Sequence, residues 1–405
     1  MDKMKLEVGT AWADITPPLE LGLLTSSVKG TYEPFLSVRS PLKAKVVALK
    51  NQGTVVALVS LDLLGLTETV VGDWKHFKEP INEALPGGTV IITCTHTHNA
   101  PESVGLSPLY ELPRFKTWLA DLRNALITAI TCASASLQPC KVRFAVSSLQ
   151  DYSLQRRIAN AGRVVLSDSM QPIGKHLMDR QPVDRRVRTM RFIDDQANTV
   201  ATVVHTACHP VHEMCLPQVS ADFPGDLCAA LARTGEAGMA LFLNGAAGDV
   251  NPPTVSMGAA YAVAHGNALA EVARRAIPEE QAVDGTLVCL SREIALPVRQ
   301  GVDWLSSSTV DACLHVLAFG PLAIVFLPGE PFTEVSNAIE HASPYKLTVV
   351  VAYGESSIGY LPTASAFDDG GYETETGRWS YLAPGAAVIV QQETIAMLKE
   401  SIQSV

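Results

Sequence analysis

The sequence lacks the features that mark membrane proteins and secreted precursors. No segment reaches the ~18 consecutive apolar residues that cross a bilayer, and the start, MDKMKLEVGTAWADITPP, has no apolar stretch typical of a signal peptide. The 8 cysteines form no CxxC pair, and several lie in apolar runs, which indicates reduced thiols and excludes a disulfide framework or a cysteine-bound zinc. We therefore expect a cytoplasmic protein that does not bind membranes.

Charge is also scarce. Charged residues make up 18% of the chain, and acidic residues outnumber basic ones to give a formal net charge of −10. This balance gives no general attraction to polyphosphate, so we expect no nucleic-acid partner. The hydrophobic fraction of 47% excludes a disordered or fibrous protein. No repeat, low-complexity tract or clear linker divides the chain, so we expect residues 1–405 to form a single domain.

Strand-like and helix-like patterns alternate along the chain. Residues 44–49 and 54–61, with Asn51, Gln52 and Gly53 between them, predict a β-hairpin. Further strands are predicted at residues 89–93, 141–146, 188–193, 199–205, 240–243, 310–318, 323–327 and 347–352. Helices are predicted at residues 114–134, 259–277 and 225–233, the last entered through residues 222–224. This mixture predicts an α/β fold with a mixed β-sheet core flanked by helices.

Several common catalytic and nucleotide-binding motifs are missing. The chain has no GxSxG nucleophile elbow, no HExxH zinc motif, no phosphate-binding P-loop and no GxGxxG dinucleotide motif. Instead, polar or ionisable residues follow directly where apolar strands end. In α/β sheets these strand ends form the crevice that binds ligands.

Four strand ends carry candidate functional residues. His96 and His98, followed by Asn99, could face one pocket together, or one could bind a metal while the other contacts substrate. His209 projects from an extended backbone before a proline. His205 is expected to be a core histidine, whereas His212 either lines the pocket or lies at its rim.

The other two strand ends carry a glutamate and a tyrosine. Glu330 follows an apolar run and a Pro-Gly turn, and a helix-start carboxylate and a site residue are equally compatible with that position. Tyr360 follows a Gly/Ser loop, where it either packs or acts as a ligand or hydrogen-bond donor. Histidines and a carboxylate from separate strand ends are the ligand types of a catalytic zinc site with an open position.

Taken together, these segments resemble the catalytic domain of the neutral/alkaline (non-lysosomal) ceramidase family. The matching segments span nearly the whole chain in the family's order: VGTAWADITPP (8–18), THTHNAP (95–101), QRR (155–157), ACHPV (207–211), SADFPG (220–225), NGAAGDVNP (244–252), PGEPFT (328–333) and GYLPT (359–363). The resemblance implies one Zn²⁺ per chain, with four ligands: His96, His209, Glu330 and Tyr360. It also implies that His98, Arg156 and Tyr372 are catalytic, holding the polar part of the substrate and stabilising the developing oxyanion.

Two departures from the family pattern bear on the substrate. Asn251 stands where ceramidases carry a serine, and Val405 ends the chain where ceramidases continue into a β-sandwich domain. We therefore expect a zinc-dependent hydrolase that cleaves the amide bond of a soluble N-acyl compound through metal-activated water, with Asn251, His212 and Asn99 contacting substrate. The alternatives are an enzyme of the same fold acting on a carbohydrate or ester, and a non-catalytic metal-binding relative. The expected partner is a small-molecule substrate, and a homo-oligomer remains an open alternative.

Overall fold

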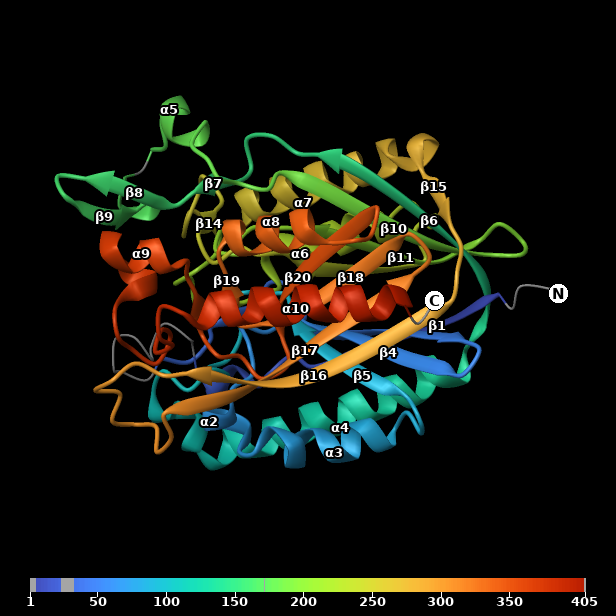
Figure 1. The fold of residues 1–405 in the computed structure, drawn as a ribbon, viewed down its shortest axis with the longest axis horizontal. Helices are drawn as coiled ribbons and strands as arrows, with labels where there is room; N and C mark the ends of the chain where they lie inside the picture. Colours follow the sequence, from blue (N-terminus) through green and yellow to red (C-terminus); the bar gives the residue numbers. More distant parts are fainter. Residues whose placement is uncertain (1–4, 23–32, 171, 404–405) are drawn as a thin grey trace.

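A 13-stranded sheet forms the centre of the molecule (Figure 1). The structure, a computed structural model, describes residues 5–22, 33–170 and 172–403. Across the sheet the strands follow in the order β13 (Met239–Asn244), β11 (Thr199–Thr206), β10 (Arg186–Asp194), β6 (Gln138–Ser148), β1 (Leu6–Asp14), β3 (Lys43–Asn51), β4 (Thr54–Leu61), β5 (Thr89–Cys94), β20 (Leu347–Gly354), β18 (Leu322–Pro328), β17 (Thr309–Phe319) and β16 (Leu287–Pro297), with β15 (Gln281–Val283) paired to β6.

The sheet is mixed. Strands β4 and β5, β11 and β13, and β18 and β20 run parallel, whereas the other neighbours are antiparallel. This confirms the prediction of an α/β fold with a mixed sheet flanked by helices. That residues 1–405 form a single domain stays a prediction.

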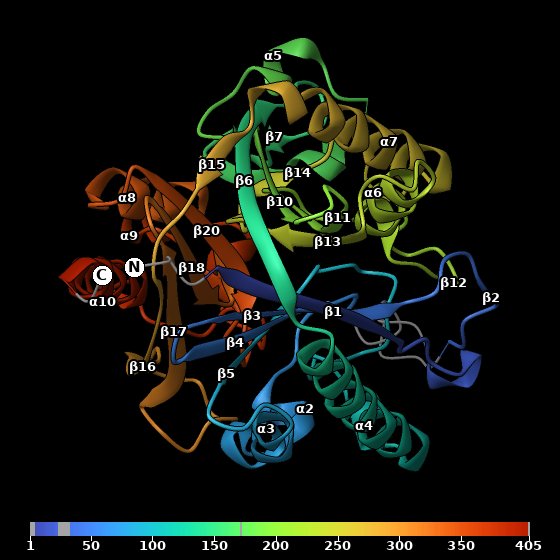
Figure 2. The ribbon, with the colours of Figure 1, turned by 90° about the vertical axis from the view of Figure 1, so that its right-hand side faces the viewer.

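The sheet curves so that three groups of its strands surround one apolar core (Figure 2). Val47 of β3, Phe192 of β10 and Phe326 of β18 all belong to this inner cluster. Ser60 of β4 donates its hydroxyl to the carbonyl of Phe242 in β13 at 2.7 Å, which joins two strands that lie far apart in the strand order. The curvature therefore brings the ends of distant strands together.

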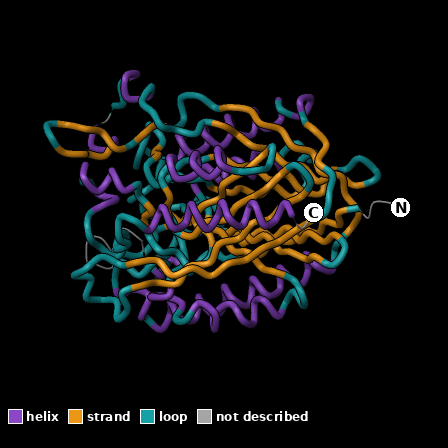
Figure 3. The backbone as a smooth tube through the Cα atoms, in the orientation of Figure 1, coloured by secondary structure: helices purple, strands orange, loops and turns teal. Residues whose placement is uncertain are grey.

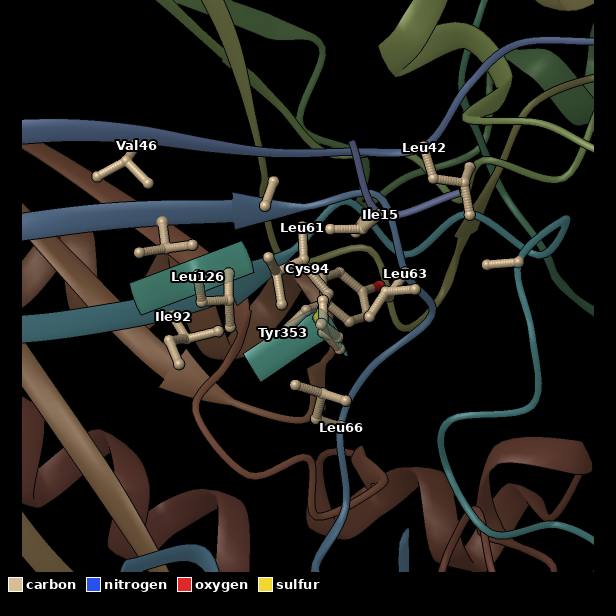
Figure 4. Close-up of a cluster of buried hydrophobic side chains, with 14 of the residues drawn as sticks. Ile15, Leu42, Val46, Leu61, Leu63, Leu66, Ile92, Cys94, Leu126 and Tyr353 are labelled. Atoms are coloured by element: carbon tan, nitrogen blue, oxygen red, sulfur yellow. The ribbon is translucent and has the colours of Figure 1, made fainter. Parts of the chain in front are cut away.

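Pairs of helices cover the outside of the curved sheet (Figures 1 and 3). The pairs are α3 (Trp74–Glu83) with α4 (Pro113–Ala135), α6 (Asp222–Ala232) with α7 (Ala259–Arg275), and α8 (Thr333–Ala342) with α10 (Ala386–Gln403). Helix α4 buries Phe115, Leu122, Leu126 and Ile130 at helical spacing against the strands. Figure 4 shows Leu126 packed with the strand residue Ile92 in this outer cluster.

Short elements build the loops around one edge of the sheet. They are β2 (Ser37–Val38), β7 (Leu154–Gln155), β8 (Arg157–Asn160), β9 (Arg163–Leu166), β12 (Gln218–Val219), β14 (Val250–Asn251), β19 (Glu330–Pro331), β21 (Tyr360–Leu361), α2 (Glu68–Val71), α5 (Lys175–Met178), α9 (Ala364–Asp369) and the 3₁₀ turns η1 (Leu19–Leu21), η2 (Pro108–Glu111), η3 (Ser167–Met170) and η5 (Tyr372–Thr374). A further 3₁₀ turn, η4 (Ile277–Glu279), joins α7 to β15 at the opposite edge. Within the described ranges, no helix combines the length and the apolar character that crossing a bilayer requires.

The sequence patterns predicted most strands of the large sheet and the helices α4, α6 and α7, with shifts at their ends. The hairpin of β3 and β4 is confirmed, with Asn51 opposite Thr54 and a positive φ of 54° at Gln52 in the turn. Helix α6 begins at Asp222, three residues before the predicted start at Gly225. Pro224 is tolerated there because the first N–H groups of a helix have no partner within the helix. Strands β1 and β16 and helices α3, α8 and α10 were not predicted.

Candidate active site

The carboxyl ends of three strands bring the candidate residues together. His96 follows β5, His209 follows β11, and Glu330 follows β18. Strands β5 and β20 meet at their carboxyl ends through the pair of Thr93 and Gly354. The curvature of the sheet thus explains why these strand ends lie together, as the sequence predicted.

The backbone fixes the orientation of both histidine rings. The Nδ1 atoms of His96 and His209 lie 2.7 Å from the carbonyl oxygens of Leu64 and Ala247, respectively. A carbonyl oxygen only accepts hydrogen bonds, so each Nδ1 carries a proton, and in its neutral form each ring presents a lone pair at Nε2. Burial, followed by the charge of Arg156, lowers the pKa of His209 to about 4, which keeps this ring neutral at pH 7.

The two lone pairs and a carboxylate oxygen converge on one point. The Nε2 atoms of His96 and His209 are 3.2 Å apart, and Oε2 of Glu330 lies 3.1 Å from the first and 3.3 Å from the second. No hydrogen bond from the described residues reaches this buried Oε2. Three electron-rich atoms so close together repel one another unless a cation lies between them, so these residues fit a metal ion such as Zn²⁺.

His98 lies within reach of the same point. One donor atom from each of His96, His98 and His209 lies within 4.8 Å of the others, so these three side chains also form a group that could hold a metal. The His98 ring is oriented by a contact of 3.2 Å between its Nδ1 and the carbonyl oxygen of His96. Loss of solvent and the neighbouring histidines lower the pKa of His98 well below its usual value, so this ring is neutral at pH 7.

Arg156 connects the metal candidates to the other predicted residues. Its Nη2 donates to the hydroxyl of Tyr360 at 2.8 Å, and its Nε donates to Oε1 of Glu373 at 2.7 Å. Its Nη1 lies 3.3 Å from both Nε2 of His209 and Oδ1 of Asn251. The guanidinium is therefore held in place from several sides beside the metal candidates.

A cavity of about 340 Å³ opens above these side chains. The predicted residues that line it are His96, His98, Arg156, His209, Asn251, Glu330, Tyr360 and Tyr372. Tyr372 is 38% exposed, and its ring stacks on Trp379 at 5.2 Å between ring centroids. Apolar side chains make up much of the remaining wall: Leu64, Val104, Leu106, Val211, Met214 and Val255.

Two predicted substrate contacts are not among the cavity-lining residues. The side-chain amide of Asn99 donates to the carbonyl oxygens of Leu216 and Gln218, both at 3.1 Å. Both ring nitrogens of His212 are engaged, Nδ1 with Thr254 at 2.8 Å and Nε2 with His265 at 3.1 Å. We therefore propose that these two side chains support the loops behind the cavity, where a contact with substrate was expected.

His205 is a core histidine, as predicted. It is buried in β11, and its Nε2 lies 2.9 Å from the carbonyl oxygen of Val350. Burial, with the neighbouring Arg188 adding to the effect, lowers its pKa to about 3. The ring is therefore neutral and satisfied within the sheet.

The sequence patterns missed a carboxylate that supports the site. Glu373 is fully buried in η5 and binds both Arg156 and Arg157. Its position directly after Tyr372 was the one signal along the chain. A buried arginine requires a carboxylate partner, and Glu373 is that partner for Arg156 and Arg157.

The Gly/Ala-rich segment after β13 packs closely against the segment that carries Glu330. A Cβ atom on Gly248 would lie 2.4 Å from the backbone oxygen of Glu330. The backbone N–H of Gly248 donates instead to the carbonyl oxygen of Pro331 at 3.0 Å. The small residue allows this loop to pack against the segment that carries Glu330.

The fold is similar to that of known ceramidases. The crystal structure of neutral ceramidase from Pseudomonas aeruginosa superposes with a TM-score of 0.78 at 16% sequence identity, over 98% of this chain and 74% of that chain. A structure of ceramidase complexed with C2 gives a TM-score of 0.77 at 15% identity, over 98% of this chain and 75% of the other. No family model and no curated protein matches the sequence. The resemblance that the short motifs indicated is thus confirmed at the level of fold: this chain has the fold of the neutral ceramidases.

Proposed function

We propose that this protein is a zinc-dependent hydrolase that cleaves the amide bond of a small, water-soluble N-acyl compound. The observation that carries the proposal is the convergence of two histidine lone pairs and the Oε2 atom of Glu330 at the base of a cavity. A site with a few convergent polar groups in a concave, mostly apolar wall is the usual form of an enzyme active site.

His96, His209 and Glu330 would hold the metal, with Tyr360 as a fourth ligand. The chemistry that zinc supplies in such a site is activation of water near neutral pH and polarisation of a carbonyl oxygen. Burial raises the pKa of Tyr360 well above its usual value, and the positive charge of Arg156, which donates a hydrogen bond to the Tyr360 hydroxyl, partly opposes this effect. Arg156 thereby links the ligand set to the substrate side of the cavity.

The residues around the metal candidates would bind the reacting amide. Arg156 carries a fixed positive charge, and Tyr372 carries a phenol whose pKa is raised to about 12, chiefly by burial, so it remains a hydrogen-bond donor at pH 7. Both can stabilise the negative charge that develops on a carbonyl oxygen. His98 is neutral and has room to accept or donate a proton at the leaving amine.

The cavity supports a small substrate. Its volume of about 340 Å³ lies near the lower end of the ~300–1,000 Å³ that small-molecule pockets occupy. The apolar wall suits a short acyl chain, and the ceramidases that share this fold suggest an N-acyl bond as the bond cleaved. Asn251 offers an amide to the substrate at the position where the ceramidase pattern has a serine.

The test compares metal-free and zinc-loaded protein on a panel of short-chain amides, esters and glycosides. Zinc should restore amide hydrolysis, and His96→Ala should abolish both zinc binding and activity, because it removes one of the converging lone pairs. His341→Ala, which removes an exposed histidine at the end of α8, is the matched control and should keep both. Turnover of glycosides or esters alone would replace the amidase proposal with the second enzymatic alternative, and zinc binding without any turnover would favour a binding protein.

A further inference from the structure

One charged side chain in the cavity wall contacts neither the metal candidates nor the residues proposed to bind the amide in any hydrogen bond or ion pair of the described residues. Asp168, in η3, lines the cavity, and its Oδ1 atom is buried without a hydrogen bond from the described residues. A buried carboxylate oxygen without a donor is costly, so such an atom in a ligand cavity indicates a donor on the ligand.

Asp168 lies on the same side of the cavity as the residues proposed to bind the amide. The backbone N–H of its neighbour Ser167 donates to the carbonyl oxygen of Arg156 at 2.8 Å, which fixes η3 beside that arginine. Asp168 and Tyr372 both line the cavity, as Arg156 does. The carboxylate is therefore positioned to meet the part of the substrate next to the amide.

The other charges of the cavity do not satisfy Asp168. Arg156 is held by Glu373 and Tyr360. Arg378 lines the cavity from an exposed position, and no ion pair joins it to Asp168 among the described residues. A ligand can therefore supply the donor that Asp168 lacks.

We propose that Asp168 determines specificity by accepting a hydrogen bond from a hydroxyl or ammonium group on the amine portion of the substrate. This inference rests on the proposed amide hydrolysis and narrows its substrate class to N-acyl amines that carry such a donor. An amine portion that ends in an ether or an alkyl group would leave the buried Oδ1 atom of Asp168 without a donor, and would be disfavoured for that reason.

The experiment uses three N-butanoyl compounds: the amide of 2-aminoethanol, its O-methyl ether and the mono-amide of ethylenediamine. Zinc-loaded wild-type protein should show kcat/KM about 10- to 100-fold higher for a compound with a donor than for the ether. The alcohol and the ammonium compound, compared with each other, identify which donor is preferred. Asp168→Ala should remove this difference by slowing only the donor compounds, whereas Asp303→Asn, which removes an exposed carboxylate elsewhere, should preserve it.

Binding measured by calorimetry gives a second readout that does not require turnover. Tighter binding of a donor compound than of the ether by wild-type protein, reduced in Asp168→Ala, is the expected result. Equal affinity and equal kcat/KM for all three compounds in wild-type protein would overturn the role of Asp168, even if the variant fails to fold. Absence of hydrolysis for every amide, with the binding difference intact, would overturn the proposed function and leave the Asp168 contact standing.

Discussion

The Tyr353 ring lies nearly parallel to the imidazole of His96, with ring centroids 4.0 Å apart and an angle of 23° between their planes. Tyr353 belongs to the apolar cluster under α4, where Figure 4 shows it beside Cys94. The backbone reaches this position at a positive φ of 57° near the end of β20. The orientation of a candidate metal ligand is thus coupled to the packing of the core.

This coupling gives a prediction for two substitutions at Tyr353. The buried hydroxyl has no hydrogen-bond partner among the described residues, so Tyr353→Phe should keep the ring contact, the zinc content and the stability. Tyr353→Ala should lower the free energy of unfolding by about 3–5 kcal/mol, the range for large aromatic truncations, and should weaken zinc binding because His96 loses its support. Urea unfolding and zinc titration measure the two effects. Equal zinc affinity in both variants would show that the backbone alone orients His96.

The ligand assignment predicts that neighbouring histidines differ in their effects. His209→Ala should lose zinc, because it removes one of the converging lone pairs. His98→Ala should keep zinc and lose about 10²–10⁴-fold in rate, as expected for a positioned acid or base. Elemental analysis and steady-state kinetics on the same preparations test both statements. Loss of zinc in His98→Ala would assign that ring to the metal, which its position close to the other two permits.

The buried Glu373 predicts a dependence of stability on pH. Burial alone would raise its pKa, but Arg156 and Arg157 hold it below the usual value. A carboxyl whose pKa is lowered in the folded state contributes stability above the pKa of the unfolded state, about 4.3, and this contribution is lost as the pH falls through the folded-state value.

Glu373→Gln should lower the free energy of unfolding at pH 7 by about 3–5 kcal/mol, because two buried guanidinium groups lose their shared anion. The loss of stability below about pH 4.3 should also be smaller in this variant than in wild-type protein. Glu375→Gln, which changes an exposed neighbour, is the control. Identical unfolding curves for Glu373→Gln and wild-type protein at pH 7 would show that the ion pairs of Glu373 with Arg156 and Arg157 add no net stability.

The positions of the metal candidates could be predicted because their signal is local. The apolar runs of β5, β11 and β18 stop at His96, His209 and Glu330, and the mixed sheet brings their carboxyl ends together. For Glu330 the sequence could not distinguish a metal ligand from a carboxylate at the start of a helix, because both follow a strand in the same way. The distances of 3.1 and 3.3 Å to the two histidines supply the missing long-range information.

The sequence could not reveal contacts that depend on the curvature of the sheet. Tyr353 ends an apolar strand, and nothing in its neighbourhood along the chain distinguishes a ring stacked on His96 from one buried in the core. His212 and Asn99 follow strands as the metal candidates do, but their side chains turn towards Thr254 and towards the loop carbonyls of Leu216 and Gln218. Spacing predicts which strand end a residue occupies, whereas the direction of its side chain is decided by the loop.

The last prediction concerns the length of the acyl chain. We expect poor hydrolysis of long-chain ceramide relative to short-chain amides, because the cavity of about 340 Å³ is small and Asn251 presents an amide, held by Arg156, where the ceramidase pattern presents a hydroxyl. The measurement compares kcat/KM for long-chain ceramide in detergent with that for N-butanoyl amides, using zinc-loaded protein. Asn251→Ser should shift this ratio towards ceramide, since the shorter side chain enlarges the cavity beside Arg156. Comparable or higher kcat/KM on long-chain ceramide in wild-type protein would show that the substrate extends beyond the cavity, and that the acyl chain is bound by a surface outside it.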